Sequence, residues 1–136
     1  MTDLTRKRDF AEKKVVSVAS AEVNYTEVDD TAQVLFNLPS DALDTDVYCV
    51  TKVAGQASLT VDVGVDGGAE FGNDLDIDNT GVTTDFRAGT GVYDTGTGTA
   101  VTATFSAAPT AGVFVFVVEY IEYTLGNGCL TNYTPV

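Results

Sequence analysis

The residues of this 136-residue chain best suited to holding a metal ion are four aspartates in its middle. Asp74, Asp76 and Asp78 alternate as the first three ligands of a calcium-binding loop do. Asp85 falls at the twelfth position, where such loops place their last carboxylate. The flanking sequence is strand-like and rich in glycine, and it lacks the two helices that enclose such a loop. The spacing therefore allows a calcium site without requiring one.

An exposed strand explains the same aspartates without a metal. Leu75 and Ile77 lie between them, so alternation would turn these two apolar side chains inward and the carboxylates toward water. Asp62, Asp66 and Glu70 form a looser acidic group, for which we favour a solvated surface. We expect no metal and no cofactor, and keep calcium as the alternative.

Catalytic chemistry finds little support elsewhere in the sequence. The chain has no histidine, which is the commonest general base and a frequent metal ligand. A pair of carboxylates can carry out glycoside hydrolysis. Carboxylates are so numerous in this sequence, however, that finding a pair is no evidence for that reaction. Cys49 and Cys129 lack a histidine to activate them, and without an export signal we expect both thiols to be free. We therefore expect that the protein is not an enzyme.

Charge divides the chain into an arm and a body. Residues 1–14 hold five basic and three acidic residues, net +2, whereas residues 15–136 hold two basic and 17 acidic ones, net −15. An acidic body repels nucleic acid, and no apolar run is long enough to cross a membrane. The arm is either a solvated terminus or a tether that docks on an acidic surface. The residues expected to bind the partner are Arg6, Lys7, Arg8, Phe10, Lys13, Lys14, Val15 and Val16.

Alternating apolar and polar residues dominate the body. The pattern predicts strands over residues 14–23, 34–38, 47–54, 59–66 and 99–105, separated by turns rich in glycine, proline and aspartate. The stretch from 64 to 98 is the least regular and predicts short strands and loops. No segment has a convincing helical stripe. We therefore expect one all-β domain over 15–136, an antiparallel, jelly-roll-like β-sandwich with an extended N-terminal arm.

The last predicted strand, residues 112–123, is apolar on both faces as far as residue 118. One face of an antiparallel sheet usually meets water, so such a strand needs a second cover. It is either a central strand covered by a loop or the N-terminal segment, or part of a subunit interface. For the interface we expect Val113, Phe114, Val115 and Phe116 to make the contact.

The order of these features resembles the capsid decoration, or cement, proteins of tailed bacteriophages and related small virion proteins. The residues that carry the resemblance are 38–39, 46–50, 59–64, 110–112 and 117–123. The resemblance implies a non-enzymatic β-sandwich, often trimeric, made in the host cytoplasm and placed on the outer surface of the head. Its partners would be the major capsid protein and further copies of itself, with the arm ordered only on assembly.

A second function belongs to a different class, namely a tail or fibre module that recognises a host surface glycan. It would require an exposed aromatic cluster, for which Tyr93, Tyr123 and Tyr133 are the candidates. Binding of the isolated protein to glycans would favour this alternative.

Overall fold

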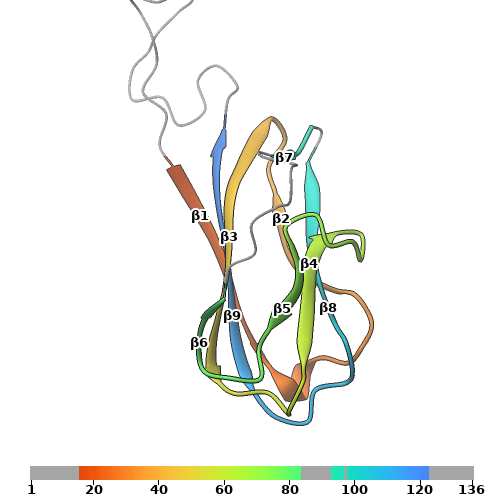
Figure 1. Cartoon of the computed structure of the whole chain (residues 1–136). Coiled ribbons are helices and arrows are strands. Elements are labelled where there is room, and N and C mark those ends of the chain that lie inside the picture. Colours follow the sequence, from red (N-terminus) through yellow and green to blue (C-terminus); the bar gives the residue numbers. More distant parts are fainter. Residues whose placement is uncertain (1–15, 84–92, 97, 123–136) are drawn as a thin grey trace, which may run out of the picture.

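The protein folds into two antiparallel β-sheets packed face to face (Figure 1). The structure, a computed structural model, describes residues 16–83, 93–96 and 98–122. Its strands are β1 (Val16–Asn24), β2 (Gln33–Leu38), β3 (Ala42–Val53), β4 (Thr60–Val65), β5 (Gly72–Asp76), β6 (Gly81–Thr83), β7 (Tyr93–Asp94), β8 (Thr99–Phe105) and β9 (Val113–Glu122). The one helical element in this described part is a 3-10 turn, η1 (Tyr25–Glu27), and no helix there could span a membrane.

Sheet A has the strand order β1-β9-β3-β6, with β7 also paired to β3, and sheet B has the order β2-β8-β4-β5. The pairs are nested. β4 pairs with β5, β3 with β6, β2 with β8 and β1 with β9, so the chain folds back on itself around the β4–β5 hairpin. This is the strand order of a jelly roll. The predicted β-sandwich is confirmed, and the irregular stretch does hold the short strands β5, β6 and β7.

Alternation along each strand places the core between the two sheets. Phe114 and Phe116 of β9 point inward and are fully buried, and the ring of Phe105 lies 5.6 Å and 6.4 Å from theirs. The other core residues are Val23, Leu38, Val47, Cys49, Leu59, Val61, Val63, Phe71, Leu75, Ile77, Val101, Ala103 and Val118. The inward faces predicted for β4 and β8 contribute Val61, Val63, Val101, Ala103 and Phe105 to this core.

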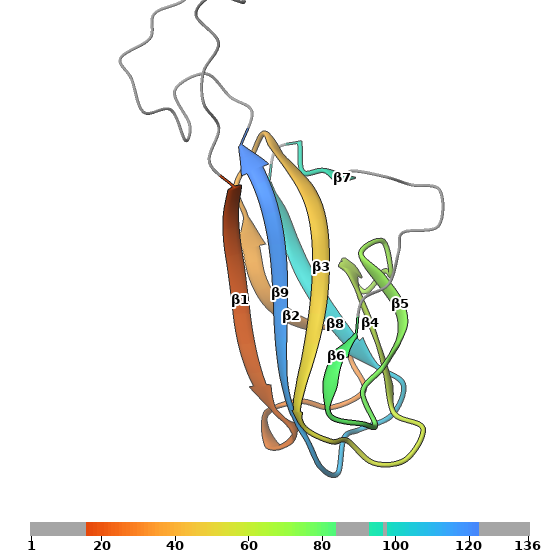
Figure 2. The same cartoon turned by 60° about the vertical axis from the view of Figure 1, so that its left-hand side comes forward.

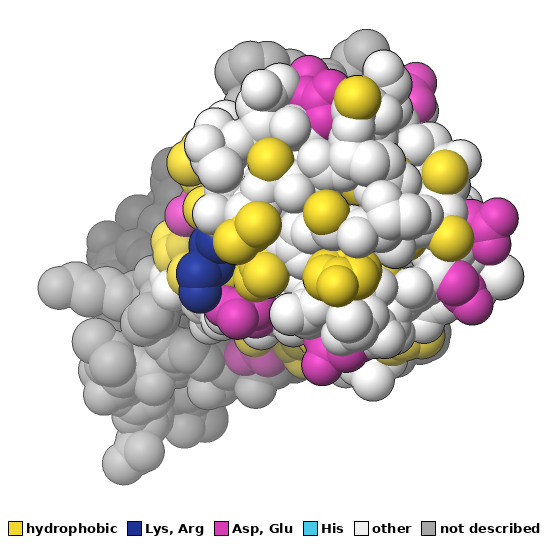
Figure 3. Space-filling view, turned by 90° about the horizontal axis from the view of Figure 1, so that it is seen from below, with side chains coloured by type: hydrophobic (Ala, Val, Ile, Leu, Met, Phe, Trp, Pro, Cys, Tyr) yellow, Lys and Arg dark blue, Asp and Glu magenta, His cyan; other side chains and the backbone are white. Residues whose placement is uncertain are grey.

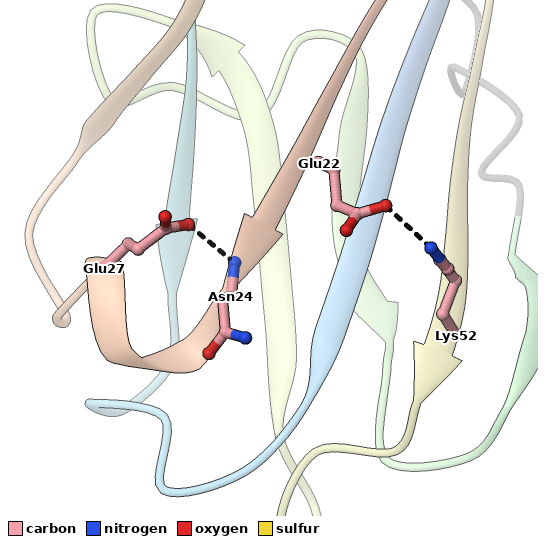
Figure 4. Close-up of polar contacts among 4 residues, drawn as sticks. All are labelled: Glu22, Asn24, Glu27 and Lys52. Atoms are coloured by element: carbon pink, nitrogen blue, oxygen red, sulfur yellow. Dashed lines mark hydrogen bonds and ion pairs between the residues drawn. The ribbon is translucent and has the colours of Figure 1, made fainter.

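The chain enters and leaves the described sandwich at one end. Val16, the first residue of β1, pairs with Ile121 near the end of β9, and the register then runs without a shift to Asn24 opposite Val113 (Figure 2). At the far end the Asn24 side chain accepts from the Thr26 backbone N–H, and Glu27 accepts from the Asn24 N–H at 2.9 Å (Figure 4). This capping box ends β1 and turns the chain toward sheet B.

Gly112 immediately precedes β9 and has a backbone conformation that other residues rarely adopt, at φ +121°. A Cβ atom at this position would overlap the ring of Phe114. Gly112→Ala should therefore lower the free energy of unfolding by about 2–4 kcal/mol, because strain and overpacking add. Gly81 also has a positive φ but has open space around it, so Gly81→Ala is the matched control with backbone strain alone. If urea denaturation shows that both variants lose the same free energy of unfolding, the overlap with the Phe114 ring does not contribute.

Candidate interaction surface: the outer face of sheet A

The outer face of sheet A carries an unusual amount of apolar surface. β9 turns Val113, Val115, Val117 and Ile121 to this face, and each is only partly covered by its neighbours. The register brings side chains of β1, β3 and β6 alongside them. The apolar residues of the outer face are Val16, Val18, Leu43, Tyr48, Val50, Val53, Val82, Val113, Val115, Val117 and Ile121. Single exposed apolar residues are ordinary, but a set of this size on one face makes that face a candidate interaction surface.

Exposure is greatest at the margins of this face. Val16 and Val18 on β1 are 51% and 58% exposed, and Val82 on β6 is 66% exposed. Val82 lies opposite Val50, which lies opposite Val115, so one apolar row crosses three strands. Within the described residues, no other element covers the outer face of sheet A. The second cover that β9 was expected to need is therefore not supplied by the described part of the chain.

Charged groups are interspersed on this face. Lys52 of β3 forms an ion pair with Glu22 of β1 at 2.8 Å, reaching across β9 (Figure 4). Both side chains are more than half exposed, so the pair adds little stability. Tyr48 donates its hydroxyl hydrogen to Asp46 at 2.8 Å. This hydrogen bond, with desolvation and the nearby Glu119, raises the pKa of Tyr48 to about 12.

The structure corrects half of the predicted subunit interface. Phe114 and Phe116 are fully buried between the two sheets, because even-numbered residues of β9 face inward. Their assignment to an intersubunit contact is wrong, since a side chain enclosed within one chain cannot meet a second copy. Val113 and Val115 do lie on the outer face, where their role in an interface stays a prediction.

The predicted alternation of the acidic strand is confirmed. Leu75 and Ile77 are buried, whereas Asp74 and Asp76 are exposed, so the aspartates face water. The Ser58 backbone N–H donates to the Asp78 carboxylate at 2.9 Å and, with a hydrogen bond to Asp76, holds the pKa of Asp78 below its usual value. Among the described residues, no three acidic or cysteine side chains are grouped to hold a metal ion. Asp85, the fourth candidate ligand, lies outside the described residues.

Cys49 lies on the inner face of β3 and is a fully buried thiol, free as expected from the sequence. Burial raises the pKa of Cys49 to about 12. Its thiolate is therefore scarce at neutral pH and its sulfur is shielded, both of which oppose reaction. Cys129 lies outside the described residues.

In a Cys129→Ser variant, we expect Cys49 to react with a disulfide reagent at least about a hundredfold slower in the native state than in urea. The matched Cys49→Ser variant reports the remaining thiol. Fast native reaction of Cys49 would place this side chain at the surface and contradict the inward face of β3.

Most residues of the predicted arm lie outside the described part of the chain, namely Arg6, Lys7, Arg8, Phe10, Lys13, Lys14 and Val15. Val16 is described, and it begins β1 with its side chain exposed on the outer face. For the glycan alternative, Tyr123, Tyr133 and the side chain of Tyr93 lie outside the described residues as well.

Sequence reasoning missed the contribution of β3 and β6 to the outer face. The alternation of each strand was visible in the sequence, but strand order was not, so Val50 and Val82 could not be placed beside Val115. A bulge between Asp44 and Asp46 also changes which residues of β3 face outward. The exposed Val82 lies in a strand of three residues, which is too short for an alternating pattern to be recognised in the sequence.

The opposite end of the sandwich, where β1 stops and β9 begins, is a different kind of surface. Figure 3 shows scattered hydrophobic side chains there, with acidic groups around the edge. Gln56 ties two of its loops together, since its amide donates to the Ala108 carbonyl and its side-chain oxygen accepts from the Thr110 N–H.

Neither a protein-family model nor a curated protein matches the sequence. Three solved phage capsid structures contain similar chains. They are the acid-stable capsid of Helicobacter pylori bacteriophage KHP30 (TM-score 0.61, 21% identity), the capsid asymmetric unit of cyanophage Pam1 (0.60, 19%) and the capsid of Ralstonia phage GP4 (0.56, 16%). The matches cover 82%, 79% and 81% of this chain and 93%, 85% and 86% of the three matched chains, in the same order. The chain therefore shares its jelly-roll fold with chains found in bacteriophage capsids, the group that its sequence resembles.

Proposed function

We propose that this protein is a non-enzymatic structural component of a phage virion, a cement or decoration protein that binds the outer surface of the assembled head. One observation carries the proposal: three of its structural neighbours are chains of phage capsids, matched over 85–93% of their own length. The overlap with the KHP30 chain, 82% of 136 residues, is about 112 residues, which is 93% of a chain of about 120. The likeness is thus between whole small chains of similar size.

The surface of the protein supports a role in binding rather than in chemistry. The outer face of sheet A supplies partly exposed valines for contact with the major capsid protein or with a further copy. The described residues contain 16 acidic side chains and one basic one, Lys52, which disfavours nucleic acid as a partner. A strongly acidic body on the outside of a head would also keep particles from associating with each other.

The arm supplies the second half of the proposed mechanism. Residues 1–14 carry a net charge of +2 and, followed by Val15, precede β1 in the sequence. An acidic groove on the shell or on a neighbouring copy would attract them. Surface ion pairs alone contribute little, so Phe10, Val15 and Val16 must add apolar contacts or strand pairing. Assembly as a trimer remains a prediction from the resemblance.

The proposal is tested by adding the purified protein to heads that lack it and separating the particles by sedimentation. We expect the protein to sediment with heads, to saturate at a fixed number of copies per shell protein, and to raise the temperature at which the heads break. Tails and fibres purified from the same phage are the matched control. Binding to tails with none to heads would overturn the cement function and favour the glycan-binding alternative.

A further inference from the structure

β1 is the one long strand with an unprotected edge among the described residues. It pairs with β9 on one side only, runs for nine residues and has no bulge (Figure 2). The other described sheet edges are short or interrupted. β6 and β7 have three and two residues, β2 has a register shift against β8, and β5 has a shift against β4. Proteins usually blunt an edge by such means, so an unblunted edge is suited to accept another strand.

The side chains of β1 add to this suitability. Neither proline nor lysine, two residues that commonly protect an edge, occurs in residues 16–24. Val16 and Val18 are more than half exposed beside that edge. Glu22 is the only charged residue of the strand, and Lys52 already neutralises it within the same chain. A second copy would therefore meet little like charge here, although its body is acidic.

We propose that β1 pairs antiparallel with β1 of a second copy across a two-fold axis, which joins both A sheets into one continuous sheet. Such a contact is isologous, since the same strand is used by both copies. It would cover Val16 and Val18 and end the exposed edge. The inference goes beyond the proposed function, because it concerns the copy-to-copy contact and assigns a dimer in place of the trimer that the resemblance implies.

The side chains select the register of this pair. Directly opposed residues in an antiparallel pair lie on the same face, so a residue of β1 can only face one an even number of positions away. With the axis at Val18, Val18 faces its own copy and Val16 faces Ser20. This register pairs residues 16–20 of the two copies with each other.

Neighbouring registers are less favourable. An axis at Ser17 would pair only residues 16–18 of the described strand. An axis at Ala19 sets Val16 opposite Glu22, and an axis at Ser20 sets Val18 opposite Glu22. The first shortens the pairing, and the other two exchange an apolar contact for an apolar-to-charge contact. Val18 is therefore the residue that lies on the proposed axis.

Cysteine cross-linking tests this contact directly. In a full-length Cys129→Ser background, whose Cys49 is buried, Val18→Cys should form a disulfide between two copies under mild oxidation. Ser20→Cys should cross-link at least about tenfold more slowly, because Ser20 faces Val16 rather than itself. Val34→Cys, on the bulged edge strand β2 with 63% exposure, is the control for a general exposed thiol.

Sedimentation equilibrium of the same full-length protein gives an independent readout. We expect a monomer–dimer equilibrium, and Val18→Lys should raise its dissociation constant at least about tenfold, whereas Val34→Lys should leave it unchanged. A monomer at all concentrations, or a trimer in which Val18→Cys stays reduced, would overturn the proposal. None of these measurements involves head binding, so the dimer and the cement function can fail separately.

Discussion

Replacing Phe116 with alanine should lower the free energy of unfolding by about 3–5 kcal/mol, a large part of the stability of a domain of this size. Phe116 is fully buried at the centre of the sandwich, and its ring meets Phe105 of the opposite sheet edge-on at 6.4 Å. The variant loses the free energy gained by burying the ring. It also leaves a cavity, because the two sheets cannot close the gap between them. Denaturation in guanidinium, followed by circular dichroism, measures the loss.

Val117→Ala is the matched control, because Val117 is the next residue of β9 and faces outward. Its loss should be below about 1.5 kcal/mol, since its side chain is only partly covered. A small effect of Phe116→Ala combined with loss of self-association would restore the original interface prediction for this residue. A large effect with unchanged self-association supports the inward face of β9.

Deletion of residues 1–14 should reduce the amount of protein bound to heads at least about tenfold, equivalent to about 1.4 kcal/mol, while leaving the unfolding midpoint unchanged. The core of the described sandwich draws on residues 23 to 118 alone, so its packing does not require the arm. The arm contributes five basic residues to a chain whose body repels other acidic surfaces. Binding is measured by sedimentation with emptied heads, and stability by thermal denaturation.

Two variants separate the charge of the arm from its apolar residues. Replacing Arg6, Lys7 and Arg8 with alanine should weaken binding most at low salt, because exposed charge pairs are screened. Replacing Phe10 and Val15 with serine should weaken binding at all salt concentrations. Undiminished binding of the deletion variant to emptied heads would remove the arm from the mechanism and leave the outer face of sheet A as the docking surface.

Strand positions and facing could be predicted because a half-buried strand records its two environments in alternate residues. The stretch over β4 is the clearest case, since Val61 and Val63 are buried and Asp62 faces outward. The acidic strand followed the same rule, with Leu75 inward and Asp76 in water. Local alternation was sufficient for these predictions because the polarity of each strand residue reflects whether that residue itself is buried.

The candidate surface could not be predicted in the same way, because it depends on strand order. β9 is apolar on both faces, so alternation could not say which face meets the second sheet. Phe114 and Phe116 were assigned to an interface for that reason, although sheet B packs on them. The nested pairing of β3 with β6 and of β1 with β9 joins residues far apart in the chain, and no short pattern encodes those contacts.

The pairing of Val16 with Ile121 also determines which end of the sandwich is suited to display an inserted peptide. Val16 and Glu122, the outermost described residues of β1 and β9, lie together at one pole of the sandwich. The loop between β8 and β9, with exposed Ala107 and Ala108, lies at the other pole. A peptide inserted between these alanines would emerge at the pole opposite Val16, and hence point outward from a head that contacts the Val16 pole.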